Sequence, residues 1–173
     1  MLPDPLHPAV VHFPIVLAVL LPAVALVALW AVHRGVRVSR AWAVPVAFAA
    51  ALALSAWVAV ETGESQEERV ERVVPESAMD THAEAAETFL YLAAGLLVFS
   101  AAGLARGTVG RAARWVATAG AVGVMAVGIN VGHKGGLLVY QHGAASAYAG
   151  AAPGPVTPGV RPAAERGEMD AGQ

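Results

Sequence analysis

Six histidines are the residues of this chain best suited to chemistry. They are His7, His12, His33, His82, His133 and His142, in a sequence of 173 residues. An imidazole ring can ligate a metal ion or a haem iron. The chain has no cysteine, which excludes disulfides, thiolate metal sites, iron–sulfur clusters and covalently attached c-type haem. Metal ligands must therefore come from His, Met, Asp or Glu.

Helix geometry separates the first two histidines. His7 and His12 lie five residues apart, which is about 140° around a helix, so a regular helix cannot bring both to one site. Because Pro8 suits a first helical position, we expect His7 before the first span and His12 within it. Alternatively, a histidine near a membrane surface serves only as an interfacial residue whose polar tip reaches water. The predicted axial ligands of a bound haem b are His12 and His82, with His142 or His133 as alternates.

Four stretches free of charged residues must position these histidines. They are Pro5 to His33, Ala41 to Val60, Thr88 to Ala105 and Trp115 to His133. Each is close to the roughly 20 residues with which a helix crosses a bilayer. The composition agrees, because 57 % of residues are hydrophobic, 14 % are charged and the mean hydropathy is +0.57. The sequence predicts an all-α, up-down, four-helix transmembrane bundle in residues 1–148, with spans at about 8–33, 41–60, 82–105 and 113–134.

Charges in the connections are sorted by sign. Three arginines follow the first span and three follow the third: Arg34, Arg37 and Arg40, then Arg106, Arg111 and Arg114. The connection from Glu61 to Glu87 carries nine acids against two arginines, and so a net charge of -7. Basic residues in short loops mark the cytoplasmic side. We therefore expect both termini and the long acidic loop on the outer side of the membrane, which for a bacterial inner membrane is the periplasm, and every histidine except His33 near that outer face.

Glycine and proline mark the end of the chain. Gly128, Gly132 and Gly136 recur every four residues, which favours close helix packing or, alternatively, admits a flat porphyrin. The adjacent Gly135 and Gly136 are expected to bend or end the fourth helix. Residues 149–173 are rich in Pro and Gly and predict a flexible, disordered tail.

Two separated motifs resemble a known bacterial family. LHPAVVHFPI runs from Leu6 to Ile15, and GHKGGLLVYQHG from Gly132 to Gly143. They resemble a widespread uncharacterised four-helix membrane domain with HPxxVHFPI at its first helix, a histidine at the start of its third and GxxGGxLVYxHG after its fourth. The resemblance implies roles for His7, His12, His82 and His142, and His133 falls outside the pattern. Relatives joined to periplasmic c-type cytochrome segments imply a redox role at the outer face.

Three function classes follow. The leading hypothesis is a membrane protein that holds haem b through histidines near the periplasmic face and passes electrons between quinol and a periplasmic carrier such as a cytochrome. The second is a copper, zinc or iron site of His12, His82 and His142 for transport or sensing. The third is an accessory subunit of a larger membrane complex. The formal charge of -2 disfavours a nucleic-acid partner, and no hydrolase or kinase motif is present.

Overall fold

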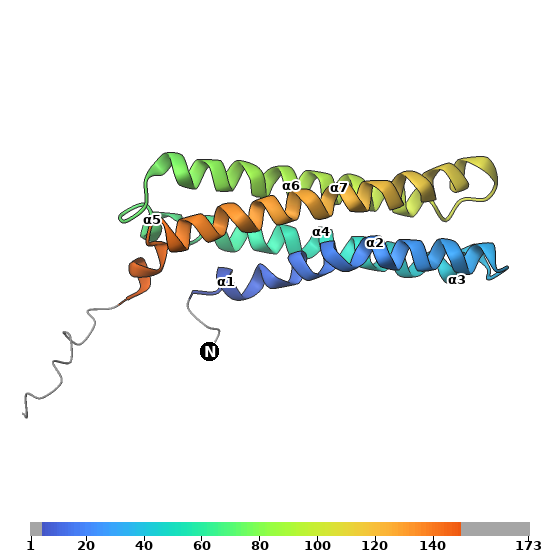
Figure 1. The fold of residues 1–173 in the computed structure, drawn as a ribbon, viewed down its shortest axis with the longest axis horizontal. Helices are drawn as coiled ribbons and strands as arrows, with labels where there is room; N and C mark the ends of the chain where they lie inside the picture. Colours follow the sequence, from blue (N-terminus) through green and yellow to red (C-terminus); the bar gives the residue numbers. More distant parts are fainter. Residues whose placement is uncertain (1–4, 150–173) are drawn as a thin grey trace, which may run out of the picture.

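Four long helices run antiparallel in the computed structural model, which describes residues 5–149 (Figure 1). The first span consists of α1 (His7–Val10) and α2 (His12–His33), and the second of α3 (Val38–Ala41) and α4 (Ala43–Glu64). The short α5 (Glu67–Val70) leads into α6 (Glu76–Ala102), which is followed by α7 (Gly107–Tyr140) and the 3-10 turn η1 (Ala144–Tyr148). Residues 5–149 contain no β-strand. The predicted all-α, four-helix architecture is confirmed. The predicted tail lies almost wholly outside the described residues.

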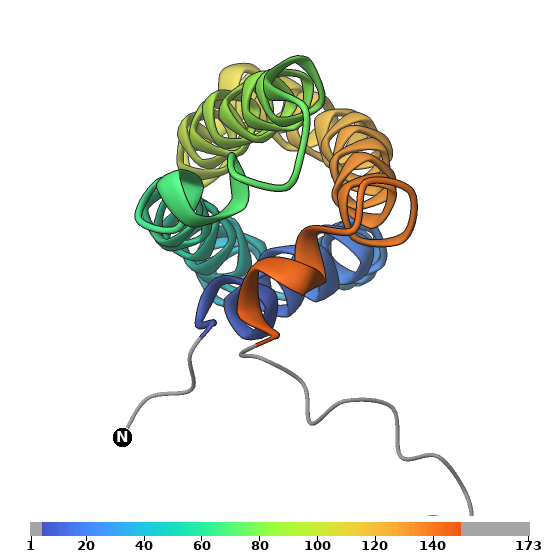
Figure 2. The ribbon, with the colours of Figure 1, turned by 90° about the vertical axis from the view of Figure 1, so that its left-hand side faces the viewer.

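The helices are arranged as a ring around one axis (Figure 2). Packing runs from α2 to α4, from α4 to α6, from α6 to α7, and from α7 back to α2. The first span therefore faces α6 diagonally across the bundle, and α4 faces α7. This arrangement decides which side chains can meet at the centre.

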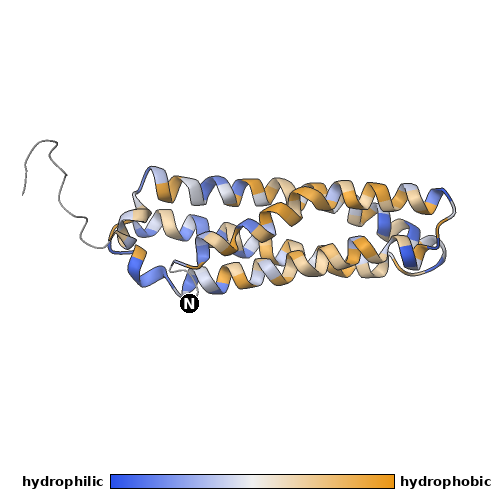
Figure 3. Ribbon diagram, turned by 90° about the horizontal axis from the view of Figure 1, so that it is seen from below, coloured by the Kyte–Doolittle hydropathy of each residue, from blue (hydrophilic) through white to orange (hydrophobic). Residues whose placement is uncertain are grey.

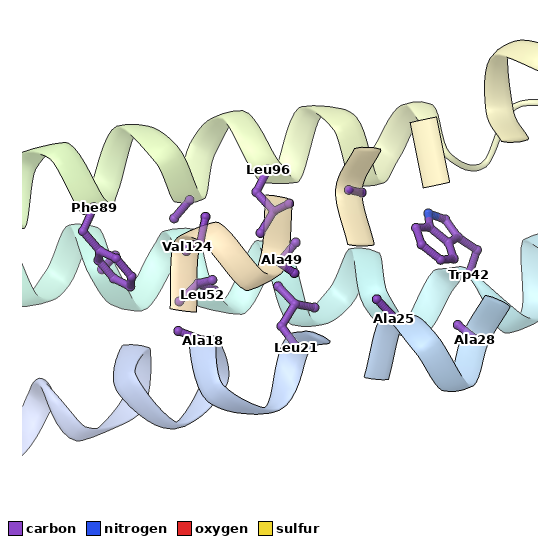
Figure 4. Close-up of a cluster of buried hydrophobic side chains, with 14 residues drawn as sticks. Ala18, Leu21, Ala25, Ala28, Trp42, Ala49, Leu52, Phe89, Leu96 and Val124 are labelled. Atoms are coloured by element: carbon purple, nitrogen blue, oxygen red, sulfur yellow. The ribbon is translucent and has the colours of Figure 1, made fainter. Parts of the chain in front are cut away.

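Small side chains fill the core and let the helices approach closely. Leu21, Leu52, Leu96 and Val124, one from each long helix, point toward the centre of the bundle (Figure 4). Alanines occupy most of the neighbouring core positions: Ala18, Ala25, Ala28, Ala49, Ala56, Ala93, Ala117 and Ala121. In α2 the buried positions recur every three or four residues, which is one face of a helix.

The outer surface is as apolar as the core along the middle of the bundle (Figure 3). Leu54 is 61 % exposed, Val98 67 % and Ile129 58 %, which would be unfavourable in water over so large a surface. The four spans contain 27, 27, 27 and 34 residues, so each exceeds the roughly 20 residues needed to cross a bilayer. Length and composition thus suit helices surrounded by lipid.

The last three spans are longer than the sequence predicted. The third, expected from about residue 82, begins at Glu76 directly after Pro75, because proline ends the preceding loop without preventing a helix that starts after it. Gly135 and Gly136, expected to bend or end the fourth helix, do not end it, since α7 continues to Tyr140. A glycine inside a helix costs only about 1 kcal/mol, which packing against the neighbouring helices offsets.

Trp42 and Arg114 hold together the end of the bundle that carries the arginine loops, which we call the arginine end. Trp42 is fully buried, and its Nε1–H donates to the Ser100 carbonyl at 2.8 Å. The buried Arg114 donates from its guanidinium to the Gly103 carbonyl at 2.6 Å. Both bonds are made at the C-terminal end of α6, because Ser100 lies in its last turn and Gly103 is its C-cap residue. The turn from α6 to α7 is therefore fixed by two buried side chains.

Candidate functional site

The side chains of His7 and His82 meet at the opposite end of the bundle, which we call the histidine end. His7 is the first residue of α1, and His82 lies in the second turn of α6. Their ring centroids are 6.5 Å apart, and the ring planes are nearly perpendicular at 85°. These helices are diagonal partners, so the two imidazoles bridge the bundle axis and do not lie on neighbouring helices.

The His7 ring is oriented by α4. Its Nδ1 lies 2.9 Å from the Ala59 carbonyl oxygen and 3.3 Å from the Thr62 hydroxyl. Thr62 itself donates to the carbonyls of Val58 and Ala59. Because a carbonyl can only accept, we assign the proton of His7 to Nδ1. Nε2 of His7 then keeps a free lone pair, which is the arrangement found in histidine metal ligands.

His82 has an unsatisfied nitrogen. Its Nδ1 is buried, and within residues 5–149 it has no hydrogen-bond partner. Buried polar atoms of this kind are uncommon in folded proteins and need an explanation. The neighbouring Thr81 carbonyl accepts a hydrogen bond from Nζ of Lys134 at 3.1 Å, which fixes a positive charge on α7 close to this site.

Glycines on the two remaining helices lie beside the rings. A Cβ added at Gly63 of α4 would come within 3.2 Å of Cε1 of His7, and one added at Gly135 of α7 within 3.1 Å of Cε1 of His82. The backbones of α4 and α7 therefore approach the imidazoles where any larger residue would need them to shift. All four spans contribute to the histidine end.

The other histidines do not join this pair. His12 and His133 are exposed, and His33 is exposed at the arginine end. His142 is half-buried in the turn between α7 and η1. Among residues 5–149, no three His, Cys, Asp or Glu side chains form a group that could hold a metal ion. The structure thus does not gather His12, His82 and His142 into a three-histidine site.

The expectation that His7 lies outside the first span was wrong, because that span begins at His7. A signal for its inward position is present in the sequence. His7 precedes the buried Pro14 by seven residues and the buried Ala18 by eleven, and both spacings keep a residue near the same helix face. His12 lies about 140° away from His7, on the outward side.

The glycine series of α7 has mixed surroundings. A Cβ at Gly128 would come within 2.9 Å of the buried Phe89 ring, so this position serves helix packing. A Cβ at Gly132 would only touch Ile15 at 3.8 Å, and one at Gly136 would meet nothing within 4 Å. The packing interpretation therefore holds at Gly128 and does not extend along the whole series.

The 3-10 turn η1, which follows α7, packs against α5 at the histidine end. The Tyr148 hydroxyl of η1 and Oε1 of Gln66 are 2.8 Å apart, and the Arg69 guanidinium lies 5.3 Å from the centre of the Tyr148 ring. Gly143, which precedes η1, has a φ of 70°, a conformation that glycine adopts easily. These contacts tie the segment after α7 to the loop that carries α5.

Replacing Gly135 with alanine should shift the His82 ring. The added methyl group meets Cε1 at close range, so we expect altered chemical shifts of the His82 imidazole nitrogens in NMR spectra of the ¹⁵N-histidine-labelled protein. The matched variant Gly136→Ala adds the same methyl group where nothing lies within 4 Å, and it should leave them in place. Equal shifts in both variants would contradict the contact.

Comparisons with known proteins give the family and no closer relative. No curated protein and no solved structure matches the chain. The family described as "Predicted membrane protein (DUF2231)" matches residues 3–147, which includes the four spans, both motifs and the histidine pair. This match agrees with the apolar surface of the bundle and with the resemblance carried by the two motifs. The chain therefore belongs to the DUF2231 family of predicted membrane proteins.

Proposed function

We propose that His7 and His82 ligate the iron of a b-type haem and that the protein transfers electrons through it. The observation that carries this proposal is the 6.5 Å separation of two imidazoles from diagonal helices. Imidazole nitrogens lie about 2.0–2.1 Å from a metal that they ligate. The two rings are therefore close enough that both could ligate one iron.

Two nitrogen donors suited to such a group are available at the histidine end. Nδ1 of His7 is held by the Ala59 carbonyl, so Nε2 remains for a metal. His82 carries the buried nitrogen without a partner. Gly63 and Gly135 bring the backbones of α4 and α7 against the two rings, so these helices would have to separate to admit a macrocycle. Haem would supply a reversible one-electron change at its iron.

The protein's own residues would bind and insulate this group. The Ala59 carbonyl orients the His7 ring and makes it a stronger ligand, as hydrogen-bonded partners of ligating histidines do. The buried Phe89, two turns after His82 on α6, excludes water on the side of the core. Lys134 would hold an anionic substituent of the macrocycle, because its ammonium group lies near His82.

The charge distribution supports an orientation of the bundle in the membrane. Arginine loops belong on the cytoplasmic side, so the histidine end faces the periplasm in the bacterial inner membrane. A centre at that depth can accept electrons from quinol in the bilayer and pass them to a periplasmic carrier such as a cytochrome. The nine acids of the connection from Glu61 to Glu87 offer a negative surface for a basic carrier.

The test is the absorption spectrum of the purified protein after expression with an ample supply of haem. We expect a Soret band and, in the reduced-minus-oxidised difference, the α-band of a b-type haem, with one haem per chain. Elemental analysis runs in parallel. A stoichiometric copper, zinc or iron content without haem would replace the proposal by a histidine metal site. Absence of haem and of metal would favour the accessory-subunit hypothesis.

A further inference from the structure

A cavity of about 530 Å³ lies at the arginine end, far from the histidine pair. It opens between the turn that precedes α4 and the turn from α6 to α7. Its walls come from one tripeptide of each turn: Arg37, Val38 and Ser39, and Leu104, Ala105 and Arg106. The cavity is therefore lined by two guanidinium cations and a hydroxyl group together with three apolar side chains.

The charge around this cavity is unbalanced. All six arginines of the two loops lie at this end, whereas every acid of residues 5–149 lies between Glu61 and Glu87. The side chains of Arg37 and Arg106 have no hydrogen-bond or ion-pair partner within the described part of the chain. The negative charge that would balance them must come from outside this bundle.

The cavity walls are fixed before any ligand arrives. Trp42 ties the start of α4 to the Ser100 carbonyl, and Arg114 ties α7 to the Gly103 carbonyl. These bonds hold the two tripeptides at a set separation, because each bond lies within a few residues of one wall. Two guanidinium groups carried by segments that are held in this way suit an anion with several acceptor oxygens.

We propose that this cavity binds the phosphate headgroup of an anionic phospholipid. A free phosphate ion would present the same oxygens, but the cavity is also lined by Val38, Leu104 and Ala105. Val109, in the first turn of α7, is also 70 % exposed. The site lies at the end of the spans, where lipid headgroups lie, and basic pockets between membrane helices are known to take anionic headgroups. Arg37 and Arg106 hold the phosphate, and the apolar side contacts the glycerol and the first acyl carbons.

Native mass spectrometry of the delipidated full chain tests this proposal. The protein in a neutral detergent is titrated with phosphatidylglycerol, with phosphatidylcholine and with inorganic phosphate. We expect one phosphatidylglycerol to bind at least about tenfold more tightly than phosphatidylcholine, and the double variant R37Q/R106Q to lose roughly 10- to 30-fold in affinity. Inorganic phosphate at millimolar concentration should not displace the lipid.

A matched variant separates a bound lipid from general attraction. R40Q/R111Q removes the same charge from two exposed arginines that do not line the cavity, and it should retain wild-type affinity within about twofold. Equal losses in both double variants would overturn the proposal in favour of diffuse attraction to the surface. Displacement by inorganic phosphate would overturn the assignment to lipid. Circular dichroism of each variant establishes that the bundle is folded.

Discussion

On the haem proposal, alanine in place of His7 or His82 should abolish the Soret band of the purified protein. Each substitution removes one of the two imidazoles whose ring centroids lie 6.5 Å apart, so only one of the two proposed ligands would remain. Changes in the second shell of a metal site already cost about 10- to 100-fold in affinity. We therefore expect haem content to fall at least about tenfold, measured as the pyridine haemochrome per chain.

The controls for this result are the exposed histidines. His12→Ala and His133→Ala remove imidazoles that point away from the bundle, and both variants should keep wild-type haem content. This comparison distinguishes the pair seen in the structure from the pair expected from sequence, His12 and His82. Loss of haem in His12→Ala with retention in His7→Ala would contradict the assignment. Size-exclusion profiles of all four variants report whether the bundle is intact.

Substituting alanine for Gly103 should destabilise the bundle strongly. A Cβ at this position would overlap Nε1 of Trp42 and come within 3.0 Å of Cγ of Arg114. Both neighbours are buried and hydrogen-bonded, so neither can move without breaking its bond to α6. Overpacking and the loss of a buried hydrogen bond together predict destabilisation of about 2–4 kcal/mol.

Reversible unfolding in mixed detergent micelles, followed by circular dichroism, measures this change in the free energy of unfolding. Gly95→Ala is the matched control on the same helix, because a Cβ there meets nothing within 4 Å. It should be neutral or stabilise by up to about 1 kcal/mol, since alanine favours a helix over glycine. The φ of Gly103 is -62°, so the expected difference arises from space and not from backbone strain. Similar values for both variants would contradict this explanation.

Composition was enough to predict the helices but not their ends. A stretch of about 20 apolar residues has few alternatives to a membrane helix, so the four spans could be read directly. The first turns of α6 and the last of α7 are polar or glycine-rich and carry no such signal. They form because the neighbouring helices extend equally far and pack against them, which is a tertiary effect.

The candidate site could be predicted only in part, because its details also depend on how the helices pack. The sequence indicated that histidines from separate spans lie near one end, and His82 is one of the two that meet there. The choice between His7 and His12 depended on which face of the first helix is buried. The proline at position 8 suggested that the helix begins after His7, whereas the spacing of His7 from Pro14 and Ala18 places it on the buried face. Glycines that touch the rings, such as Gly63, could not be identified without the packing.

The contact between Tyr148 and Gln66 has a practical consequence for labelling. It anchors the chain at the histidine end shortly before residue 149, so a fluorescent or redox-active reporter attached soon after that point is tethered within reach of the histidine pair. A reporter inserted at the exposed Gly35 turn begins a full span length away. Comparing reporters at the two attachment points therefore shows how a signal depends on distance from the histidine pair along the bundle axis.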